Sequence, residues 1–358
     1  MNKDVFVVLM AGGLGTRFWP YSRNHKPKQF LDILGTGKTL LQATADRFQN
    51  TCPQENIYVV TNVEHVELVK SQLPFLTDEQ ILAEPMRRNT APCIAYATYK
   101  IKKKNSGAVM IVSPSDHIIL NEEAFQAVIN ESIQDARGND RLITLGIKPN
   151  RPETGYGYIQ YLSSDSKIKK VKTFTEKPEL SLAKQFLESG DFVWNSGIFI
   201  WSAEAIYQAF QRHLPELAEI FDDIEGDILT EKEGQSIRNA YSLCKNISID
   251  YGVMEKAENV YVMLADFSWS DLGSWTTLHE LSKKDIANNY VDANTMLYDS
   301  RNCVIKGPND KLIVVQGLNG YLVGYFDNVL IICEKDKEAQ FRSFVNDVKG
   351  KPDGSNYL

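Results

Sequence analysis

The sequence has 358 residues, of which 43% are hydrophobic and 24% are charged, a composition typical of a folded globular protein. Its formal net charge is -7 and it has no long basic block, which argues against a nucleic-acid partner. The five cysteines lack CxxC spacing, so they predict free thiols rather than a disulfide framework or a zinc site. No apolar run approaches the ~20 residues of a membrane span, and we expect a cytoplasmic protein without membrane contact.

The N-terminal part alternates between β-rich runs and helical segments. The runs VFVVLM, NIYVVT, AVMIVS and RLITLG recur up to residue 146, and such alternation is typical of βαβ units. A helix over residues 90–104 is marked by Asn89 as a capping residue and by three lysines at its end. We therefore predict an α/β fold: a Rossmann-like, mixed and mainly parallel sheet flanked by helices.

The middle of the chain continues this pattern, whereas the C-terminal part differs. Strands are predicted at GYGYIQY, VKTFTEK and SGIFIW, with helices at 179–188 and 203–212. Beyond residue 282, short apolar runs broken by Gly, Asn and Asp predict a small β domain. We place a catalytic domain at 1–285 and a β-rich domain at 286–358.

The segment after the first strand is rich in glycine and positive charge. Gly12, Gly13 and Gly15 allow backbone N–H groups to converge on phosphate oxygens. Arg17 and Lys28 add positive charge where a polyphosphate would lie. This combination predicts a phosphate-binding loop.

Two other phosphate-binding motifs fit less well. A dinucleotide fingerprint requires glycine where this chain has Phe18. Gly37-Lys38-Thr39 resembles the end of a Walker A loop, but Asp32 replaces its first glycine. We interpret that second segment as a turn before a helix that starts near Thr39.

The full run GGLGTR at 12–17, followed by PKQF at 27–30, resembles the loop of the sugar-1-phosphate nucleotidylyltransferases. Its flanks look like the mannose-1-phosphate guanylyltransferase branch, and further matches extend over roughly residues 5–282. The resemblance implies the nucleotide-diphospho-sugar transferase fold. It also implies a short left-handed β-helix near the C-terminus, through which a homodimer would form.

The resemblance assigns binding residues on the positions that match its motifs. Those assigned to the nucleotide are Ala11, Gly12, Gly13, Gly15, Thr16, Glu84, Pro85, Asn89 and Thr90. Those assigned to the sugar phosphate are Gly157, Glu176, Lys177 and Asn195. Each match alone has a structural alternative: Asn89 or Thr90 would cap a helix, and Gly157 would suit a β-bulge.

Two aspartates are the candidate metal ligands. Asp116 follows the run AVMIVS and Asp271 lies in FSWSDLGSW; carboxylates are ligands that Mg²⁺ prefers, and the family uses matching aspartates. His117 is interpreted as local structure, because a phosphate monoester is already ionised and needs no general base. The run 249–256 also resembles the family, but we interpret Asp250 as a helix cap.

The implied reaction joins GTP and mannose 1-phosphate with Mg²⁺ as cofactor, and Arg17 and Lys28 are its candidate catalytic residues. One alternative keeps the enzyme class with a thymidylyl, uridylyl or adenylyl group and a glucose or N-acetylglucosamine phosphate. A regulator without activity is disfavoured because the charged residues are all present. A nicotinamide-dependent oxidoreductase is disfavoured by Phe18 and by the lack of an acidic ribose-binding residue.

Overall fold

The computed structural model describes residues 2–358, and the chain divides into two compact units. The first comprises Met1–Gly12, Thr44–Ser115 and Ile119–Trp269, and the second Gly13–Ala43, Asp116–Ile118 and Ser270–Leu358. These units are interleaved along the chain because three connections leave the first unit and enter the second. The predicted functional boundary after residue 285 is a different division, and it stays a prediction.

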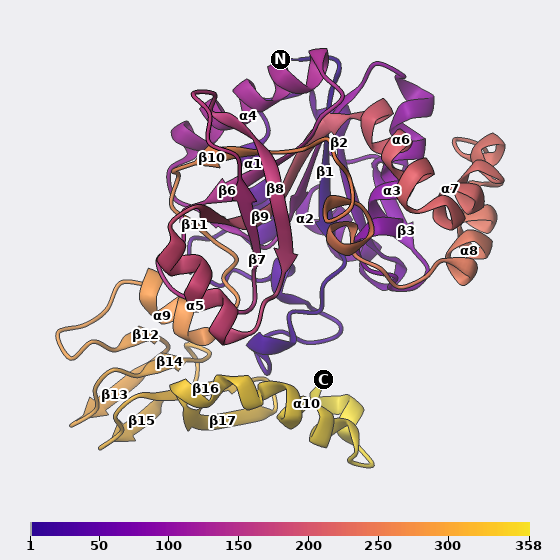
Figure 1. Cartoon of the computed structure of the whole chain (residues 1–358). Helices are drawn as coiled ribbons and strands as arrows, with labels where there is room; N and C mark the ends of the chain where they lie inside the picture. Colours follow the sequence, from indigo (N-terminus) through magenta and orange to yellow (C-terminus); the bar gives the residue numbers. More distant parts are fainter. Residues whose placement is uncertain (1) are drawn as a thin grey trace. The chain divides into compact units, whose positions relative to one another are not determined.

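The first unit is built on a nine-stranded mixed sheet with the order β3-β2-β1-β4-β9-β6-β10-β8-β7 (Figure 1). Its strands are β1 Val5–Ala11, β2 Ile57–Asn62, β3 Ile81–Glu84, β4 Val109–Pro114, β6 Leu142–Ile147, β7 Gly157–Tyr161, β8 Ile168–Glu176, β9 Phe192–Ser202 and β10 Val260–Ala265. The pairs within β3-β2-β1-β4 and the β6–β10 pair are parallel. Strands β7, β8 and β9 pair antiparallel with their neighbours.

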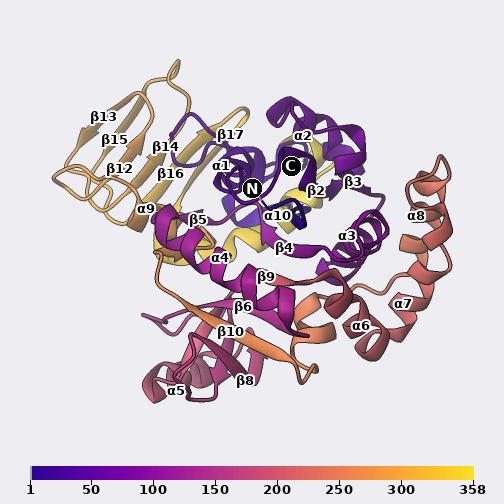
Figure 2. The same cartoon turned by 90° about the horizontal axis from the view of Figure 1, so that it is seen from above.

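Helices cover both faces of this sheet, as predicted. Figures 1 and 2 show α3, α6, α7 and α8 on one face and α4 on the other. Parallel neighbours in the sheet need crossover connections, and such connections place helices on the faces of the sheet. The helices of the first unit are α2 Val66–Gln72, α3 Thr90–Lys104, α4 Glu122–Gly138, α5 Leu180–Ser189, α6 Ala203–His213, α7 Pro215–Asp222 and α8 Glu233–Leu243.

Shorter elements complete the chain's local structure. Helix α1 (Leu40–Arg47) and the short strands β5 (Ile118–Ile119) and β11 (Trp269–Ser270) occur where the chain passes from one unit to the other. A π-helix spans Asp250–Met254. Short 3₁₀ segments lie at Thr16–Phe18, Lys28–Phe30, Gln54–Asn56, Val63–His65, Asp78–Gln80, Glu225–Asp227, Lys335–Gln340 and Gly354–Tyr357.

The second unit contains the predicted C-terminal β-rich region. Its strands are β12 Tyr290–Asp292, β13 Thr295–Tyr298, β14 Val304–Lys306, β15 Ile313–Gln316, β16 Tyr321–Phe326 and β17 Val329–Glu334. Strands β12, β14 and β16 form one parallel ladder and β13 and β15 another, so successive coils of chain stack on one another. That stacking is typical of a β-helix; its hand and the expected homodimer stay predictions.

The end of the second unit differs from the β-rich expectation, because it is helical. Helix α10 spans Phe341–Lys349, and α9 (Trp275–Leu281) precedes the strands. Phe341 and Val345 are buried, four residues apart, so they lie on one face of the helix. The apolar spacing of Phe341, Phe344, Val345 and Val348 was the sequence signal for this helix.

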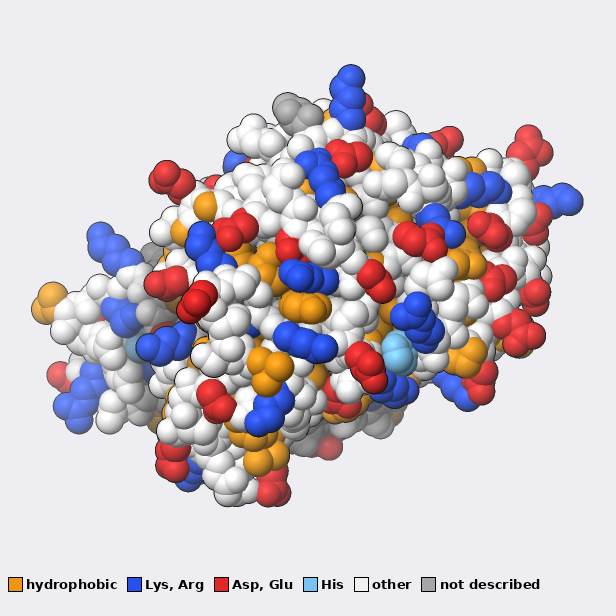
Figure 3. Space-filling view, turned by 45° about the horizontal axis from the view of Figure 1, so that its top comes forward, with side chains coloured by type: hydrophobic (Ala, Val, Ile, Leu, Met, Phe, Trp, Pro, Cys, Tyr) orange, Lys and Arg blue, Asp and Glu red, His pale blue; other side chains and the backbone are white. Residues whose placement is uncertain are grey.

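The surface charge, the cysteines and the helix lengths can be compared with what the composition predicted. Lys and Arg intermingle with Asp and Glu on the face drawn in Figure 3, without a block of one sign. All five cysteines are free thiols, four of them buried. Within residues 2–358, no helix is both long and apolar enough to cross a bilayer.

Candidate functional site

The end of β1 in the first unit places Gly12 beside a buried carboxyl group. Ala11 accepts a hydrogen bond from Thr61 Oγ1 at 3.0 Å, which fixes the last residue of the strand. A Cβ atom on Gly12 would lie 3.2 Å from Glu84 Oε2. Two residues assigned to the nucleotide from distant segments are therefore adjacent at the carboxyl edge of the parallel strands, the usual ligand edge of such sheets.

The glycine loop of the second unit is folded against the segment that carries Lys28. Gly15 adopts a positive φ of 64°, and a Cβ there would overlap the Cβ of Lys28, so the position requires glycine. Ser22 Oγ donates to the Gly15 carbonyl at 2.6 Å, and Gln29 Nε2 donates to the Gly13 carbonyl at 3.0 Å. These bonds explain why the glycine run and the PKQ segment occur together in the sequence.

Phe18 anchors this loop to the core of the second unit. Its side chain is fully buried, and its ring centroid lies 5.0 Å from that of Trp275 in α9. The residue that argued against a dinucleotide fingerprint therefore has a packing role: it holds the short helix Thr16–Phe18, which carries Arg17.

The four charged residues predicted for catalysis and metal binding all belong to the second unit, and the structure brings them together. Lys28 Nζ donates to Asp116 Oδ2 at 2.9 Å and to the Asp271 carbonyl at 2.7 Å. Arg17 is exposed, and its guanidinium donates to the Gly273 carbonyl at 3.5 Å. Lys28 is only 4% exposed, so its ammonium is fixed by packing whereas Arg17 faces solvent.

The carboxylates of this cluster are suited to a hard divalent cation. Desolvation alone would raise the pKa of Asp116, but the Lys28 ammonium and His117 outweigh it and lower that pKa below its ordinary value. Asp271 Oδ1 accepts from Gly273 N at 2.9 Å, which orients that side chain. Residues 2–358 contain no group of three or more His, Cys, Asp or Glu side chains positioned for a metal.

The two carboxylates of Asp116 and Asp271 are nevertheless enough for a Mg²⁺ site. Magnesium usually keeps several waters and binds through one or two carboxylates together with substrate phosphates. Asp116 and Asp271 supply hard oxygen donors, and one lysine ammonium contacts both residues. The donor set is therefore suited to a Mg²⁺ ion that arrives with a nucleoside triphosphate.

Glu84 is a buried carboxyl group in the first unit. It is 4% exposed, and Tyr241 OH donates to its Oε1 at 3.1 Å. Burial raises the pKa of Glu84 to about 7, against the opposing effects of Tyr241 and Arg87. A carboxyl group in this state responds to a ligand that donates hydrogen bonds, because such bonds favour the ionised form.

Asn89 has the capping role that was its alternative interpretation, whereas Thr90 is not the cap. Asn89 has a φ of 69° and its side chain accepts from Thr90 N, so it caps α3. Thr90 Oγ1 accepts from Ile249 N at 2.8 Å. Pro85 precedes them in the same connection after β3; the nucleotide assignment of all three stays a prediction.

The four residues assigned to the sugar phosphate come from β7, β8 and β9 of the first unit and the residue after β8. A Cβ on Gly157 would lie 2.5 Å from Glu176 Oε2 and 3.2 Å from Asn195 Cβ, so these three residues adjoin. Lys177 forms an ion pair with Glu176 and has a φ of 49°, a strained conformation that often occurs at functional sites. Lys177 is 55% exposed at its side chain, against 7% for Glu176.

The hydrogen bonds of Asn195 fix its orientation. Its Oδ1 accepts from Thr144 Oγ1 at 2.8 Å and from Gly197 N at 3.1 Å. Its Nδ2 donates to Asp250 Oδ1 at 2.9 Å. These three bonds do not use the second N–H of the amide.

Asp250 is the functional candidate that sequence reasoning missed, and its interpretation as a helix cap is wrong. It is the first residue of the π-helix, whose cap position is Ile249, and its carboxylate accepts from Asn195. Burial, and next the charge of Glu176, raise the pKa of Asp250 to about 7. The resemblance of residues 249–256 to the family was the sequence signal that Asp250 belongs to the site.

Comparisons with known proteins show the family to which the chain belongs. Residues 6–288 match the family model described as Nucleotidyl transferase. The alginate biosynthesis protein AlgA of Pseudomonas syringae pv. tomato is 35% identical over 363 residues, which cover 98% of this chain and 74% of that protein. A mannose-1-phosphate guanylyltransferase of Escherichia coli is 32% identical over 363 residues, which cover 98% and 77%.

A solved structure extends the likeness to the whole fold. It is the crystal structure of a mannose-1-phosphate geranyltransferase from Thermus thermophilus. It aligns with a TM-score of 0.87 at 30% identity and covers 97% of this chain and 100% of that one. The likeness therefore includes the C-terminal region as well as the large sheet.

Proposed function

This chain belongs to the nucleotidyl transferase family, and from that premise we propose that it is a mannose-1-phosphate guanylyltransferase. The reaction joins GTP and α-D-mannose 1-phosphate to give GDP-mannose and diphosphate. The observation that carries the proposal is the cluster at the glycine loop, in which Lys28 contacts both Asp116 and Asp271. The name of the relative from Escherichia coli supports the choice of substrates.

The chemistry is an in-line displacement at the α-phosphorus of GTP. A phosphate oxygen of mannose 1-phosphate attacks, the bond to the bridging oxygen breaks, and diphosphate leaves with the electron pair. The attacking monoester is already ionised, so no side chain must remove a proton. One phosphoanhydride replaces another, and the reaction is accordingly reversible.

The loop residues supply positioning and positive charge for this displacement. In the proposal, backbone N–H groups from Ala11 to Thr16 bind phosphate oxygens, while Arg17 and Lys28 neutralise the triphosphate. Fixed charges of this kind stabilise the transition state because they need no reorganisation during the reaction. Asp116 and Asp271 would hold Mg²⁺, which neutralises the charge on the phosphates when it is bound.

The remaining residues would select and hold the two substrates. Glu84 accepts hydrogen bonds from guanine or ribose, with Pro85, Asn89 and Thr90 bordering the same connection. Lys177 binds the phosphate of the sugar, and Glu176 and Asn195 bind its hydroxyl groups beside Gly157. Both substrates are highly charged and do not cross membranes unaided, so we place the reaction in the cytoplasm.

The first experiment compares two exposed cations of the same loop. Arg17→Ala should lower turnover of GTP and mannose 1-phosphate by ~10² while the unfolding midpoint stays unchanged, because it removes a charge from the developing transition state. Lys26→Ala is the control: Lys26 is also exposed and its loss changes the net charge equally. Initial rates of GDP-mannose formation measure both. Equal rates for the two variants would contradict the proposed role of the loop.

A further inference from the structure

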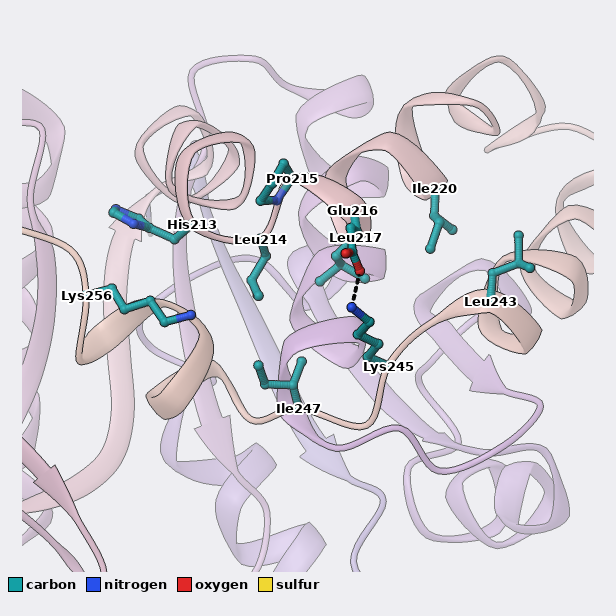
Figure 4. Close-up of a pocket in the computed structure, with 10 residues that line it drawn as sticks. All are labelled: His213, Leu214, Pro215, Glu216, Leu217, Ile220, Leu243, Lys245, Ile247 and Lys256. Atoms are coloured by element: carbon teal, nitrogen blue, oxygen red, sulfur yellow. Dashed lines mark ion pairs between the residues drawn. The ribbon is translucent and has the colours of Figure 1, made fainter.

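A hollow in the first unit lies outside the residues assigned to either substrate. It has a volume of about 270 Å³ and lies where α6 meets α7, beside the segment after α8. Figure 4 shows Leu214, Ile220, Leu243 and Ile247 around it. Leu243 is 69% exposed, so an apolar surface is open to solvent in a hollow of small-molecule size.

The charges at the rim of this pocket leave one unpaired cation. Glu216 and Lys245 form an ion pair at 2.5 Å and neutralise each other on one side. On the other side, Figure 4 shows the Lys256 side chain extending toward Leu214 and Ile247. Among the residues that the structure describes, no carboxylate pairs with Lys256.

Burial and the nearby cations act on the neighbouring histidine in the same direction. Desolvation lowers the pKa of His213, and the charges of Lys256 and Arg212 lower it further, against the opposing charge of Glu258. A protein of net charge -7 therefore has a local cation beside an apolar surface, since the other two charges at the rim, Glu216 and Lys245, neutralise each other. The complementary ligand is an anion with an apolar body.

We infer that this pocket binds a small amphiphilic anion and is an effector site of the enzyme. The apolar body of the ligand lies over Leu214, Leu243 and Ile247, and its carboxylate, sulfonate or phosphate group pairs with Lys256. Burying an open leucine surface favours binding because it removes apolar area from water, and the charge pair fixes the orientation of the ligand. None of the residues assigned to GTP or the sugar phosphate lines the pocket.

The pocket wall is packed directly against the π-helix Asp250–Met254. A Cβ on Gly252 would lie 2.7 Å from Leu214 Cδ1, so no free space separates this side chain from the helix. A ligand that shifts Leu214 toward the helix therefore also displaces the helix. Asp250 in turn holds Asn195, which is assigned to the sugar. π-Helical turns are frequent at functional sites, and this one joins the pocket to a substrate residue.

A second connection runs through the segment that precedes the π-helix. The carbonyl of Ile247, which lines the pocket, accepts from Ala91 N at 3.1 Å. Two residues on, Ile249 N donates to Thr90 Oγ1 at 2.8 Å. Ile247 is therefore hydrogen-bonded to the start of α3, whose first residue, Thr90, is assigned to the nucleotide. This effect on catalysis rests on the proposed function, whereas the binding does not.

The test of binding uses 1-anilinonaphthalene-8-sulfonate, an aromatic sulfonate, titrated by fluorescence into the full chain. Lys256→Glu removes the cation and Leu243→Glu places a negative charge on an exposed position, so each should weaken binding at least ~10-fold. The matched controls are Lys232→Glu and Leu162→Glu, at exposed sites outside the pocket. They should bind like the wild type. One shared affinity for all five proteins would overturn the site.

The test of regulation uses the same dye in the turnover assay. We expect it to change the KM for mannose 1-phosphate at least ~3-fold in the wild type and in Lys232→Glu, and to have no effect in Lys256→Glu. An equal effect in both variants would overturn the coupling. Loss of the proposed function would appear as absent turnover without dye, and the fluorescence titration would still decide whether the pocket binds.

Discussion

The role of Asp250 depends on residues that are far from it in the sequence. Its neighbours along the chain predict a helix cap, because aspartate commonly begins a helix. In the fold its carboxylate accepts from Asn195, 55 positions away, and burial and Glu176 raise its pKa to about 7. No local pattern contains that information. Arg17, Lys28 and Asp116, in contrast, were assigned from local motifs; the structure places Lys28 against Asp116, and their catalytic roles stay predictions.

The raised pKa of Asp250 makes a pH-dependent contribution to stability. The folded state binds its proton more tightly than the unfolded chain does, so the wild type loses stability as pH rises from about 4 to about 7. The groups that face it include Glu176, Lys177 and Asn195. Asp250→Asn cannot ionise and should lose this part of the pH dependence.

Urea midpoints at pH 5 and pH 8 measure the effect. Asp250→Asn should be more stable relative to the wild type at pH 8 than at pH 5. Asp223→Asn, on an exposed position of the same unit, should show no such difference. A difference in urea midpoint between Asp250→Asn and the wild type that is the same at both pH values would contradict the account.

At the scale of elements, the sequence predicted the helices that have a capping residue at the start and basic residues at the end. The helix at Thr90–Lys104 begins after a capping asparagine and ends in lysines, and its predicted bounds are confirmed. The antiparallel insertion of β9 between β4 and β6 could not be predicted, because a buried strand has the same apolar pattern in either direction. The direction is set by tertiary packing.

The close packing of strand β6 against its neighbours β9 and β10 gives a prediction about stability. A Cβ on Gly146 would lie 2.5 Å from Val262 Cγ2 and 2.6 Å from Val193 Cγ2, and β-branched side chains adjust little. Gly146→Ala should therefore lower the free energy of unfolding by about 1–3 kcal/mol. Gly226→Ala is the control, since nothing lies within 4 Å of its added Cβ. Equal urea midpoints for both variants would show that the strands can adjust.

At the scale of the whole molecule, the residues assigned to the reaction belong to two units that are interleaved along the chain. Residues 13–17 of the phosphate loop, Asp116 and Asp271 belong to one unit, and the residues assigned to the base and the sugar belong to the other. The sequence predicted the fold class because the alternation of strands and helices is a local pattern; the phosphate-binding role of the glycine loop stays a prediction. It placed a boundary after residue 285 but could not reveal that residues 13–43 pack with the C-terminal region, which depends on contacts such as Phe18 with Trp275.

The central claim is that this chain transfers a guanylyl group to mannose 1-phosphate, and the most direct measurement is diphosphate release by the full chain. Parallel reactions contain Mg²⁺ and GTP, ATP, UTP or dTTP, each with and without mannose 1-phosphate, glucose 1-phosphate or N-acetylglucosamine 1-phosphate. The account predicts release that requires both GTP and mannose 1-phosphate and ceases when EDTA removes the metal. Faster release with another pair of substrates, or release without any sugar phosphate, would contradict it.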